Sequence, residues 1–448
     1  METRGKQRRD FLNQSQLALT NEMIAKANED SARKQTLLAT EQRIRAQRLR
    51  MLSIAQSMAV KSIQIDRDKE RKGLTALQAF LFNQKFEGPA RQGDIYSGLY
   101  EAMKMLYPPG YNILKGHDGA VRAVTFIPRS TIVYSAGADG KVIRHDISDS
   151  SSVRIIIQNP NVNEAIAASA DGKWLAVGAT GIGIQLFNLG SVDPTPKVIS
   201  AHDGQVRSLA FSSDSRSLYS TGTDNTIVQW SLPNLNLIKT VPNTLRITKL
   251  VVSPDGSTLF ASSRDGDIMA YNINQDFSKR LIYSEKSNPV YCIANTSNGK
   301  YLATGDLQGN IKIWSIDSGK MLASLRGHIS RVTDVQFSPN DLVLGSVGAD
   351  GTVRLWDMSD FSNPPVVLQD NGGVGWSISF SSDNQFFVSG SADENRLVFR
   401  PVSADIMAGE ICPRISRNMT KDEWNTYVGS DIPYENTCTT HLRANQNK

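Results

Sequence analysis

Residues 327–358 read GHISRVTDVQFSPNDLVLGSVGADGTVRLWDM and contain one structural repeat in its clearest form. An apolar strand follows Gly327-His328, a turn holds Asp350, and a later strand closes on Trp356. The same layout recurs along the chain, with steps of 42, 43, 41, 43, 42 and 43 residues between closing positions. A fixed period of this length is typical of a β-propeller, in which each repeat forms one blade of a closed ring. The closing positions are His145, Phe187, Trp230, Tyr271, Trp314, Trp356 and Phe399.

The spacing inside the repeat is as constant as the period. An Asp lies six residues before most closing positions, as Asp350 does before Trp356. In three repeats a Gly-His or Ala-His pair places His117, His202 or His328 at 28 residues before the closing position. Insertions therefore fall between repeats, and we expect a mainly β fold with seven blades.

This combination of motifs resembles the WD-repeat family over about residues 111–402. The resemblance implies a buried tetrad of His, Ser or Thr, Asp and Trp, whose hydrogen bonds satisfy polar groups that would cost about 1–3 kcal/mol each if left unpaired. Repeat one keeps His117, Ser135 and Asp139 but has His145 in place of Trp, so the sequence leaves undecided whether this repeat forms a tetrad. Repeats two, four and five are expected to depend on packing instead. The complete tetrads carried over are His202, Ser220, Asp224 and Trp230 in repeat three, and His328, Ser346, Asp350 and Trp356 in repeat six.

Helical segments are predicted before the ring. Residues 12–64 lack Pro and Gly and are rich in helix formers, and an apolar stripe begins at Leu37. We assign 1–66 to a helical arm, a candidate coiled coil, in which residues 1–35 have the weaker stripe and are expected to fray. Helices at 68–85 and 94–106 form a small helical module within 67–110.

The two ends of the ring are expected to meet. Tyr111 to Lys115 reads as a strand that supplies the outer strand of the last blade, because no further strand follows Phe399. The tail, 403–448, contains two predicted helices, the second with a capping box formed by Thr420 and Glu423. We expect Trp424 and Tyr427 to anchor that helix on the outside of a blade, and the last ten or so residues to be mobile.

The order of helices, ring and tail looks like the C-terminal part of bacterial STAND-type signalling NTPases with WD-repeat sensors. The NTPase core of those proteins has no counterpart here, because the Gly-Lys pairs lack the flanking residues of a phosphate-binding loop. The resemblance implies a sensing or scaffolding role.

Charge and composition limit the remaining classes. The net charge is +5, and residues 1–70 hold 14 Lys or Arg against 9 Asp or Glu, so the excess lies on the arm. This distribution argues against a nucleic-acid-binding ring. There is no apolar run long enough for an integral membrane segment and no secretory signal, which favours a cytoplasmic protein. Cys292, Cys412 and Cys438 are too few and too scattered for a disulfide framework or a zinc site, so we expect free thiols in a reducing compartment.

No catalytic constellation is evident, and we expect no enzyme activity, no cofactor and no metal. The tetrads account for the coexistence of Ser, His and Asp, and turn chemistry accounts for carboxylates such as Asp171 and Asp214. The leading hypothesis is a scaffold or sensor whose ring binds a protein or peptide and whose arm couples this to oligomerisation or to an effector. The alternatives are a small-molecule-binding or catalytic propeller, and binding of the arm to an anionic surface.

In WD-repeat proteins the residue that enters the innermost strand often lines the mouth of the central channel. Two Arg, a Tyr and a Trp at this position match the composition of binding hot spots, with Trp376 the sharpest candidate. The alternative is that these are ordinary rim residues that face water or neighbouring loops. The set, which we call the mouth residues, is Arg122, Glu164, Arg207, Thr248, Tyr291, Thr333 and Trp376.

Overall fold

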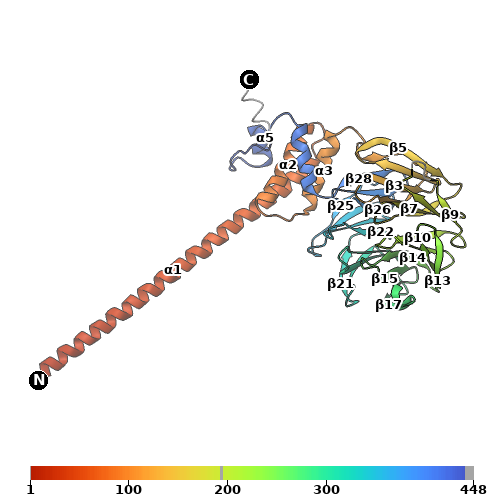
Figure 1. The fold of residues 1–448 in the computed structure, drawn as a ribbon. Coiled ribbons are helices and arrows are strands. Elements are labelled where there is room, and N and C mark those ends of the chain that lie inside the picture. The colour runs from red at the N-terminus through yellow and green to blue at the C-terminus, as the bar shows by residue number, and fades with distance from the viewer. Residues whose placement is uncertain (1, 192–194, 439–448) are drawn as a thin grey trace.

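The computed structural model describes residues 2–191 and 195–438 and has two parts, a long helix and a ring with smaller helices at its side (Figure 1). The described residues form seven sheets of four strands each, which confirms the seven-bladed propeller. The helices are α1 (Glu2–Ile63), α2 (Lys69–Lys85), α3 (Gly93–Leu106), α4 (Ala404–Ile411) and α5 (Lys421–Tyr427), with short 3₁₀ turns η1 (Ile273–Gln275) and η2 (Cys412–Arg414).

Each blade is an antiparallel meander that runs from the channel outward. The first three blades are β2 (Val121–Phe126), β3 (Ile132–Gly137), β4 (Lys141–Asp146) and β5 (Asp149–Gln158); β6 (Asn163–Ala168), β7 (Trp174–Ala179), β8 (Gly183–Asn188) and β9 (Lys197–Ile199); and β10 (Val206–Phe211), β11 (Ser217–Gly222), β12 (Thr226–Ser231) and β13 (Asn236–Pro242).

Blades four to six repeat this arrangement, and blade seven borrows one strand from the start of the ring. Their strands are β14 (Ile247–Val252), β15 (Thr258–Ser263), β16 (Asp267–Asn272) and β17 (Ser278–Ser284); β18 (Val290–Asn295), β19 (Tyr301–Asp306), β20 (Asn310–Ser315) and β21 (Met321–Arg326); β22 (Val332–Phe337), β23 (Val343–Gly348), β24 (Val353–Asp357) and β25 (Val366–Leu368); and β26 (Gly375–Phe380), β27 (Phe386–Ser391), β28 (Leu397–Pro401) and β1 (Ile113–Leu114).

The ring closes where the sequence predicted. β1 pairs antiparallel with β28, with Ile113 opposite Val398 and Leu114 opposite Leu397. Leu114 is fully buried in a cluster that also holds Val121 and Phe399, so both ends of the ring share one core. This closure removes the free edge that a seventh blade of three strands would expose.

The helical module is fixed to the outside of blades six and seven. The Tyr96 hydroxyl donates to the Pro401 carbonyl at 2.6 Å, and the Tyr100 hydroxyl donates to Asp370 Oδ2 at 2.6 Å. Asp370 also accepts from Arg400 Nε at 3.0 Å and from Nη2 at 2.8 Å. One hydrophobic cluster contains residues of α1, α2, α3, the tail and blades six and seven, so the module and the seam of the ring share one core.

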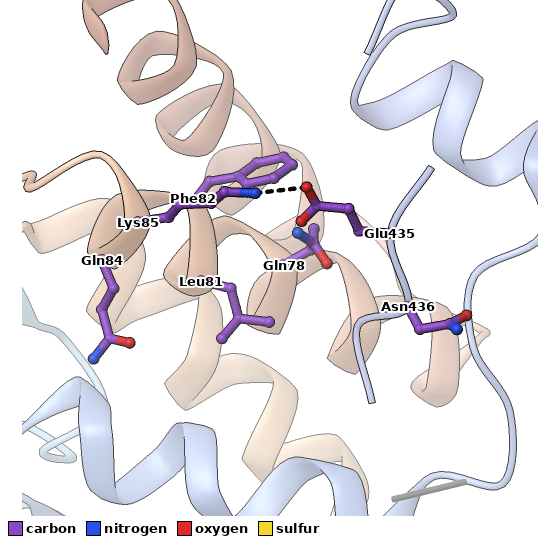
Figure 2. A pocket seen from close by; sticks show the side chains of 7 residues that line it. All are labelled: Gln78, Leu81, Phe82, Gln84, Lys85, Glu435 and Asn436. Carbon is purple, nitrogen blue, oxygen red and sulfur yellow. Dashed lines mark hydrogen bonds and ion pairs between the residues drawn. The ribbon is translucent and has the colours of Figure 1, made fainter. Parts of the chain in front are cut away.

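The tail folds back on the helical module. The Thr420–Glu423 capping box is present at the start of α5, as predicted. The expectation that Trp424 anchors α5 on a blade is wrong, because the buried indole packs against Phe82 of α2, with ring centroids 5.9 Å apart. Beyond α5, Glu435 forms an ion pair of 2.6 Å with Lys85 of α2 (Figure 2).

The cysteine prediction is wrong for two of the three residues. Cys412 and Cys438 form a disulfide, and only Cys292 remains a free thiol, buried in the ring. Sequence spacing could not reveal this pair because the fold of the tail brings the two residues together. Disulfides persist in oxidising environments, so the cysteines no longer argue for a reducing compartment.

The arm is one continuous helix that projects away from the ring (Figure 1). At 1.5 Å per residue, its 62 residues span about 93 Å. The helix includes residues 2–35, where the sequence predicted fraying. Every side chain from Asn13 to Arg50 is exposed, and side-chain burial begins at Met51. None of the helices in the described part of the chain is long and apolar enough to cross a membrane. The predicted mobility of the last ten residues concerns positions 439–448, which lie outside the described residues.

Candidate functional site: the channel mouth

The mouth residues occupy one special position in each blade. The pairing of the first two strands shifts register at the start of every innermost strand. In blade seven, for example, Gly375 lies opposite Ser391 and Ser377 lies opposite Gly390, so Trp376 is the extra residue. Such β-bulges direct a side chain away from the regular strand pattern and are common at functional sites. All seven mouth residues are the extra residues of these bulges.

The structure brings all seven mouth residues to one cavity. This channel cavity has a volume of about 740 Å³ and is lined by the innermost strands of all seven blades. A second cavity, of about 420 Å³, lies between α2 and the tail and is lined by residues such as Gln78, Leu81 and Asn436 (Figure 2). The channel cavity is larger and is lined by more charged and aromatic side chains, so we take it as the candidate site.

Two of the mouth residues hold neighbouring blades together. Thr248 Oγ1 donates to the Val290 carbonyl at 2.8 Å, and Thr333 Oγ1 donates to the Gly375 carbonyl at 2.6 Å. In both cases the acceptor begins the innermost strand of the next blade. These hydroxyls are therefore engaged within the ring, which leaves Arg122, Glu164, Arg207, Tyr291 and Trp376 as the polar and aromatic groups of the mouth.

Arginines lie over the two aromatic rings of the mouth. The guanidinium carbon of Arg122 lies 4.2 Å from the centroid of the Trp376 ring. Arg331 lies 5.3 Å from the same centroid and 4.9 Å from that of Tyr291. Arg264, which belongs to blade four, lies 5.7 Å from the Tyr291 centroid. Cation–π contacts of this kind are worth about 0.5–2 kcal/mol each and hold the guanidinium groups at fixed positions.

Sequence reasoning missed Arg264 and Arg331, both of which line the cavity. Arg331 lies two residues before Thr333, in the loop that leads into the innermost strand of blade six. Arg264 lies one residue before Asp265, in the turn between the second and third strands of blade four. Both arginines line the cavity from these loops. The sequence signal that could have found them is an Arg two residues before a mouth residue or one residue before the turn Asp of the repeat.

The mouth carries a positive charge. Among the residues that line the cavity, Lys249 pairs with Asp334, which leaves four arginines against Glu164 and a formal charge of +3. Within residues 2–191 and 195–438, no carboxylate forms an ion pair with Arg122, Arg207, Arg264 or Arg331. Burial lowers the pKa of Arg207, and the nearby charge of Arg264 lowers it further. A group in this state gains stability from an anion.

The tetrads of repeats three and six form complete hydrogen-bonded chains. In repeat six, His328 Nδ1 lies 3.0 Å from Asp350, His328 Nε2 lies 2.8 Å from Ser346 Oγ, and Trp356 Nε1 donates to that oxygen at 2.9 Å. Repeat three has the same contacts among His202, Ser220, Asp224 and Trp230. Burial lowers the pKa of both histidines, which favours their neutral form.

Repeat one completes its network with a second histidine. Ser135 Oγ lies 2.8 Å from His117 Nε2 and 3.0 Å from His145 Nε2. His145 thus takes the place that Trp has in repeats three and six. Burial lowers the pKa of His145 to about 3, so this imidazole is neutral in the folded protein near pH 7.

The expectation that repeats two, four and five rely on packing alone is wrong. In repeat two, Asn159 exchanges two hydrogen bonds with Gln185. In repeat four, Asn243 donates to the hydroxyl of Tyr271. In repeat five, Asn288 donates to Asp306 at 2.8 Å and Trp314 donates to Thr304 at 3.0 Å. In repeats two and four an asparagine thus takes the position that His has in repeats one, three and six, and its amide supplies both a donor and an acceptor.

The Ser-His-Asp sets lie away from the mouth cavity. Ser135, Ser220 and Ser346 are fully buried between strands, and none of them lines the channel cavity. In the described part of the chain there is no group of three or more His, Cys, Asp or Glu side chains arranged to hold a metal ion. The chemistry that the mouth offers is therefore recognition by guanidinium groups and aromatic rings.

The family model of the WD domain, G-beta repeat, matches six segments of the chain: residues 111–146, 194–231, 236–272, 278–315, 319–357 and 363–395. The second blade is the one without a match of its own, and it is the blade in which Asn159 and Gln185 replace the tetrad.

The curated relatives that match this chain are distant. The chain is 23% identical to target of rapamycin complex subunit wat1 of Schizosaccharomyces pombe, over 58% of this chain and 79% of that protein. It is 28% identical to an uncharacterized WD repeat-containing protein of Synechocystis sp., over 54% of this chain and 70% of the relative. It is 23% identical to protein groucho of Drosophila melanogaster, over 64% of this chain but only 39% of that protein. With six matched repeats inside a ring of seven blades, the chain belongs to the WD-repeat family.

Proposed function

We propose that this protein is a non-enzymatic interaction scaffold or sensor whose channel mouth binds a protein or peptide partner. The observation that carries the proposal is the convergence of Arg122, Arg207, Tyr291 and Trp376 on one cavity. Arg, Tyr and Trp are the residue types that contribute most to binding energy in protein interfaces. Since bulges on a rigid closed ring present them, little conformational entropy is lost when a partner binds.

The relatives support a role in assemblies. One is named a subunit of the target of rapamycin complex, and another, from Gallus gallus, is named a serine-threonine kinase receptor-associated protein. Both names describe proteins that associate with others, and the similarity covers 58% and 54% of this chain.

The arm is proposed to mediate self-association. A single helix in water is marginally stable, so an exposed helix such as residues 13–50 gains most when its apolar side chains are covered. Leu37, Leu38 and Ile44 are 61%, 47% and 63% exposed. Because the end of α1 packs into the module that is fixed to blades six and seven, an association through the arm would be rigidly linked to the ring. The resemblance to STAND-type sensors adds an effector as a further candidate for that link.

Self-association is tested by light scattering coupled to gel filtration. Replacing Leu37, Leu38 and Ile44 by lysine should convert an oligomer of the full chain to a monomer. The matched control replaces Gln35, Gln42 and Gln47 by lysine, which adds the same charge to the same helix and should leave the oligomer intact. A monomeric wild-type chain would end this part of the proposal.

Partner binding is tested by affinity capture from native lysate with quantitative mass spectrometry. Three baits are compared: the wild type, the double variant Arg207→Ala with Trp376→Ala, and a control with Arg280→Ala and Leu281→Ala on the outer strand β17. The proposal expects a protein that is captured by the wild type and the control and lost with the mouth variant. Equal capture by all three baits would place the binding site elsewhere.

A further inference from the structure

Four of the mouth residues and two further cavity-lining arginines form a continuous series around the channel, which we call the arginine–aromatic arc. In order around the ring they are Arg122, Trp376, Arg331, Tyr291, Arg264 and Arg207. The first five are linked by cation–π contacts with guanidinium-to-centroid distances of 4.2, 5.3, 4.9 and 5.7 Å. The sixth extends the arc into blade three, where the charge of Arg264 already acts on Arg207.

The geometry points to a peptide segment with several spaced acidic side chains as the occupant of this arc. The inference rests on the proposed function and makes it specific, because it states the chemistry of the partner. Its first support is charge: four arginines without ion-pair partners in the described chain lie on one cavity with a formal charge of +3. Carboxylates are strong partners for guanidinium groups because two parallel hydrogen bonds form between them.

Unused hydrogen-bond donors are the second support. The Nε atoms of Arg122, Arg207 and Arg331 and the Nε1 atom of Trp376 are buried and have no hydrogen-bond partner in the described residues. A native structure rarely leaves such donors unpaired, since each costs about 1–3 kcal/mol. Unpaired Nε atoms also occur away from the mouth, at Arg71, Arg91 and Arg396. The four donors of the arc differ because their side chains line one cavity, in which a ligand with its bridging waters supplies acceptors at several points.

The distribution of the charges selects among anions. The arginines are spread over blades one, three, four and six, so a single phosphate group contacts only part of the arc, whereas an extended acidic peptide reaches all of it. A single-stranded nucleic acid would need open aromatic faces for its bases. Here Trp376 and Tyr291 each already carry two guanidinium groups, which reduces the ring surface open to stacking.

The test uses the full-length protein and fluorescence anisotropy. The probe is a labelled ten-residue peptide of alternating glycine and glutamate, and its counterpart has glutamine in place of glutamate. A labelled oligothymidine of ten nucleotides serves as the nucleic-acid arm. The variants are Arg122→Gln with Arg331→Gln, and a control with Arg154→Gln and Arg280→Gln, which removes the same charge from outer strands β5 and β17.

We expect the glutamate peptide to bind at least about tenfold more tightly than the glutamine peptide, and its affinity to fall about tenfold or more in the mouth variant but not in the control. Equal affinity for the two peptides, or equal loss in both variants, overturns the inference. Tighter binding of oligothymidine with the same dependence on Arg122 and Arg331 overturns it in favour of nucleic acid.

Failure of this inference is distinguishable from failure of the proposed function. If the mouth variant loses its lysate partner while the glutamate and glutamine peptides bind alike, the mouth binds a partner that is not acidic. If neither experiment depends on the mouth, the proposed function fails as well.

Discussion

One ion pair, between fully buried Arg400 and partly exposed Asp370, supports the contact between α3 and the seam of the ring, and its removal should be costly. Arg400 is fully buried in β28, and Asp370 supplies its carboxylate at 3.0 Å from Nε and 2.8 Å from Nη2. The substitution Asp370→Asn keeps the size of the side chain but leaves the guanidinium without its counter-charge. Breaking a buried pair in this way costs about 3–5 kcal/mol. The expected loss in the free energy of unfolding is in that range.

The assay is equilibrium urea unfolding followed by tryptophan fluorescence. The matched control is Asp276→Asn, which removes the partner of Lys239 at the surface and should cost less than about 1 kcal/mol. A second variant, Tyr100→Phe, removes the hydroxyl that bonds both Asp370 and Asn112 and should cost about 2 kcal/mol. If Asp370→Asn costs no more than the control, the reasoning about this pair is refuted.

The same carboxylate predicts a pH dependence. Burial acts to raise the pKa of Asp370, but the Arg400 charge and the hydrogen bonds from Tyr100 and Arg400 bring the pKa below its usual value. A lowered pKa in the folded state contributes stability above the unfolded-state pKa near 3.9, and this stability is lost as pH falls through the folded pKa. The Asp370→Asn variant should lack this acid-side loss.

Three further predictions concern the ring and the tail. Asp350→Asn should lower the free energy of unfolding by about 2–3 kcal/mol, because Asp350 accepts hydrogen bonds from His328 and two backbone amides. In the same urea assay, the control Asp317→Asn, at an exposed residue, should have little effect. The pKa of His145 is lowered to about 3 in the folded protein, against about 6.5 in the unfolded chain, so the wild type should lose stability as pH falls from about 6.5 to about 3. His145→Trp should reduce this loss, and identical pH profiles of stability for the two proteins would contradict the prediction. Thiol titration of the denatured, unreduced protein should find the one thiol of Cys292, and three reactive thiols without reductant would show that the Cys412–Cys438 disulfide is absent.

The period and the mouth were predictable because both follow from local spacing. The bulge occurs at the same offset in every blade, so counting from Phe126 or Phe337 was enough to place Arg122 and Thr333 on one cavity. Arg331 was missed although it lies only two residues from Thr333, because its role appears only when the successive blades five, six and seven pack side by side and place Tyr291 and Trp376 on either side of it.

The substituted tetrads show a signal that was present in the sequence. Asn159, Asn243 and Asn371 each lie 28 residues before their closing positions, at the place where other repeats have His. A search for His alone missed that Asn offers comparable hydrogen bonding. In repeat seven, Asn371 and Arg400 meet at Ser389, with distances of 2.6 and 2.8 Å.

The tail was predicted least well because its contacts are the most distant in sequence. The capping box of α5 is local and was found, whereas the packing of Trp424 on Phe82 joins residues more than three hundred positions apart. An amphipathic helix shows which face is apolar but not which surface will cover it. The same limit applies to the pairing of Cys412 with Cys438, which depends on how the tail folds against α2.

Site-specific photo-crosslinking can establish whether the channel mouth is the surface that binds a partner. A photoreactive phenylalanine replaces Gln205, which lines the mouth cavity, or Leu281, which is exposed on the outer strand β17. Each protein is irradiated in native lysate with and without the Trp376→Ala substitution. If the mouth binds a partner, position 205 should give a specific adduct that disappears with Trp376→Ala, and position 281 should give none. An adduct from position 281 alone, or one from position 205 that persists with Trp376→Ala, would contradict it.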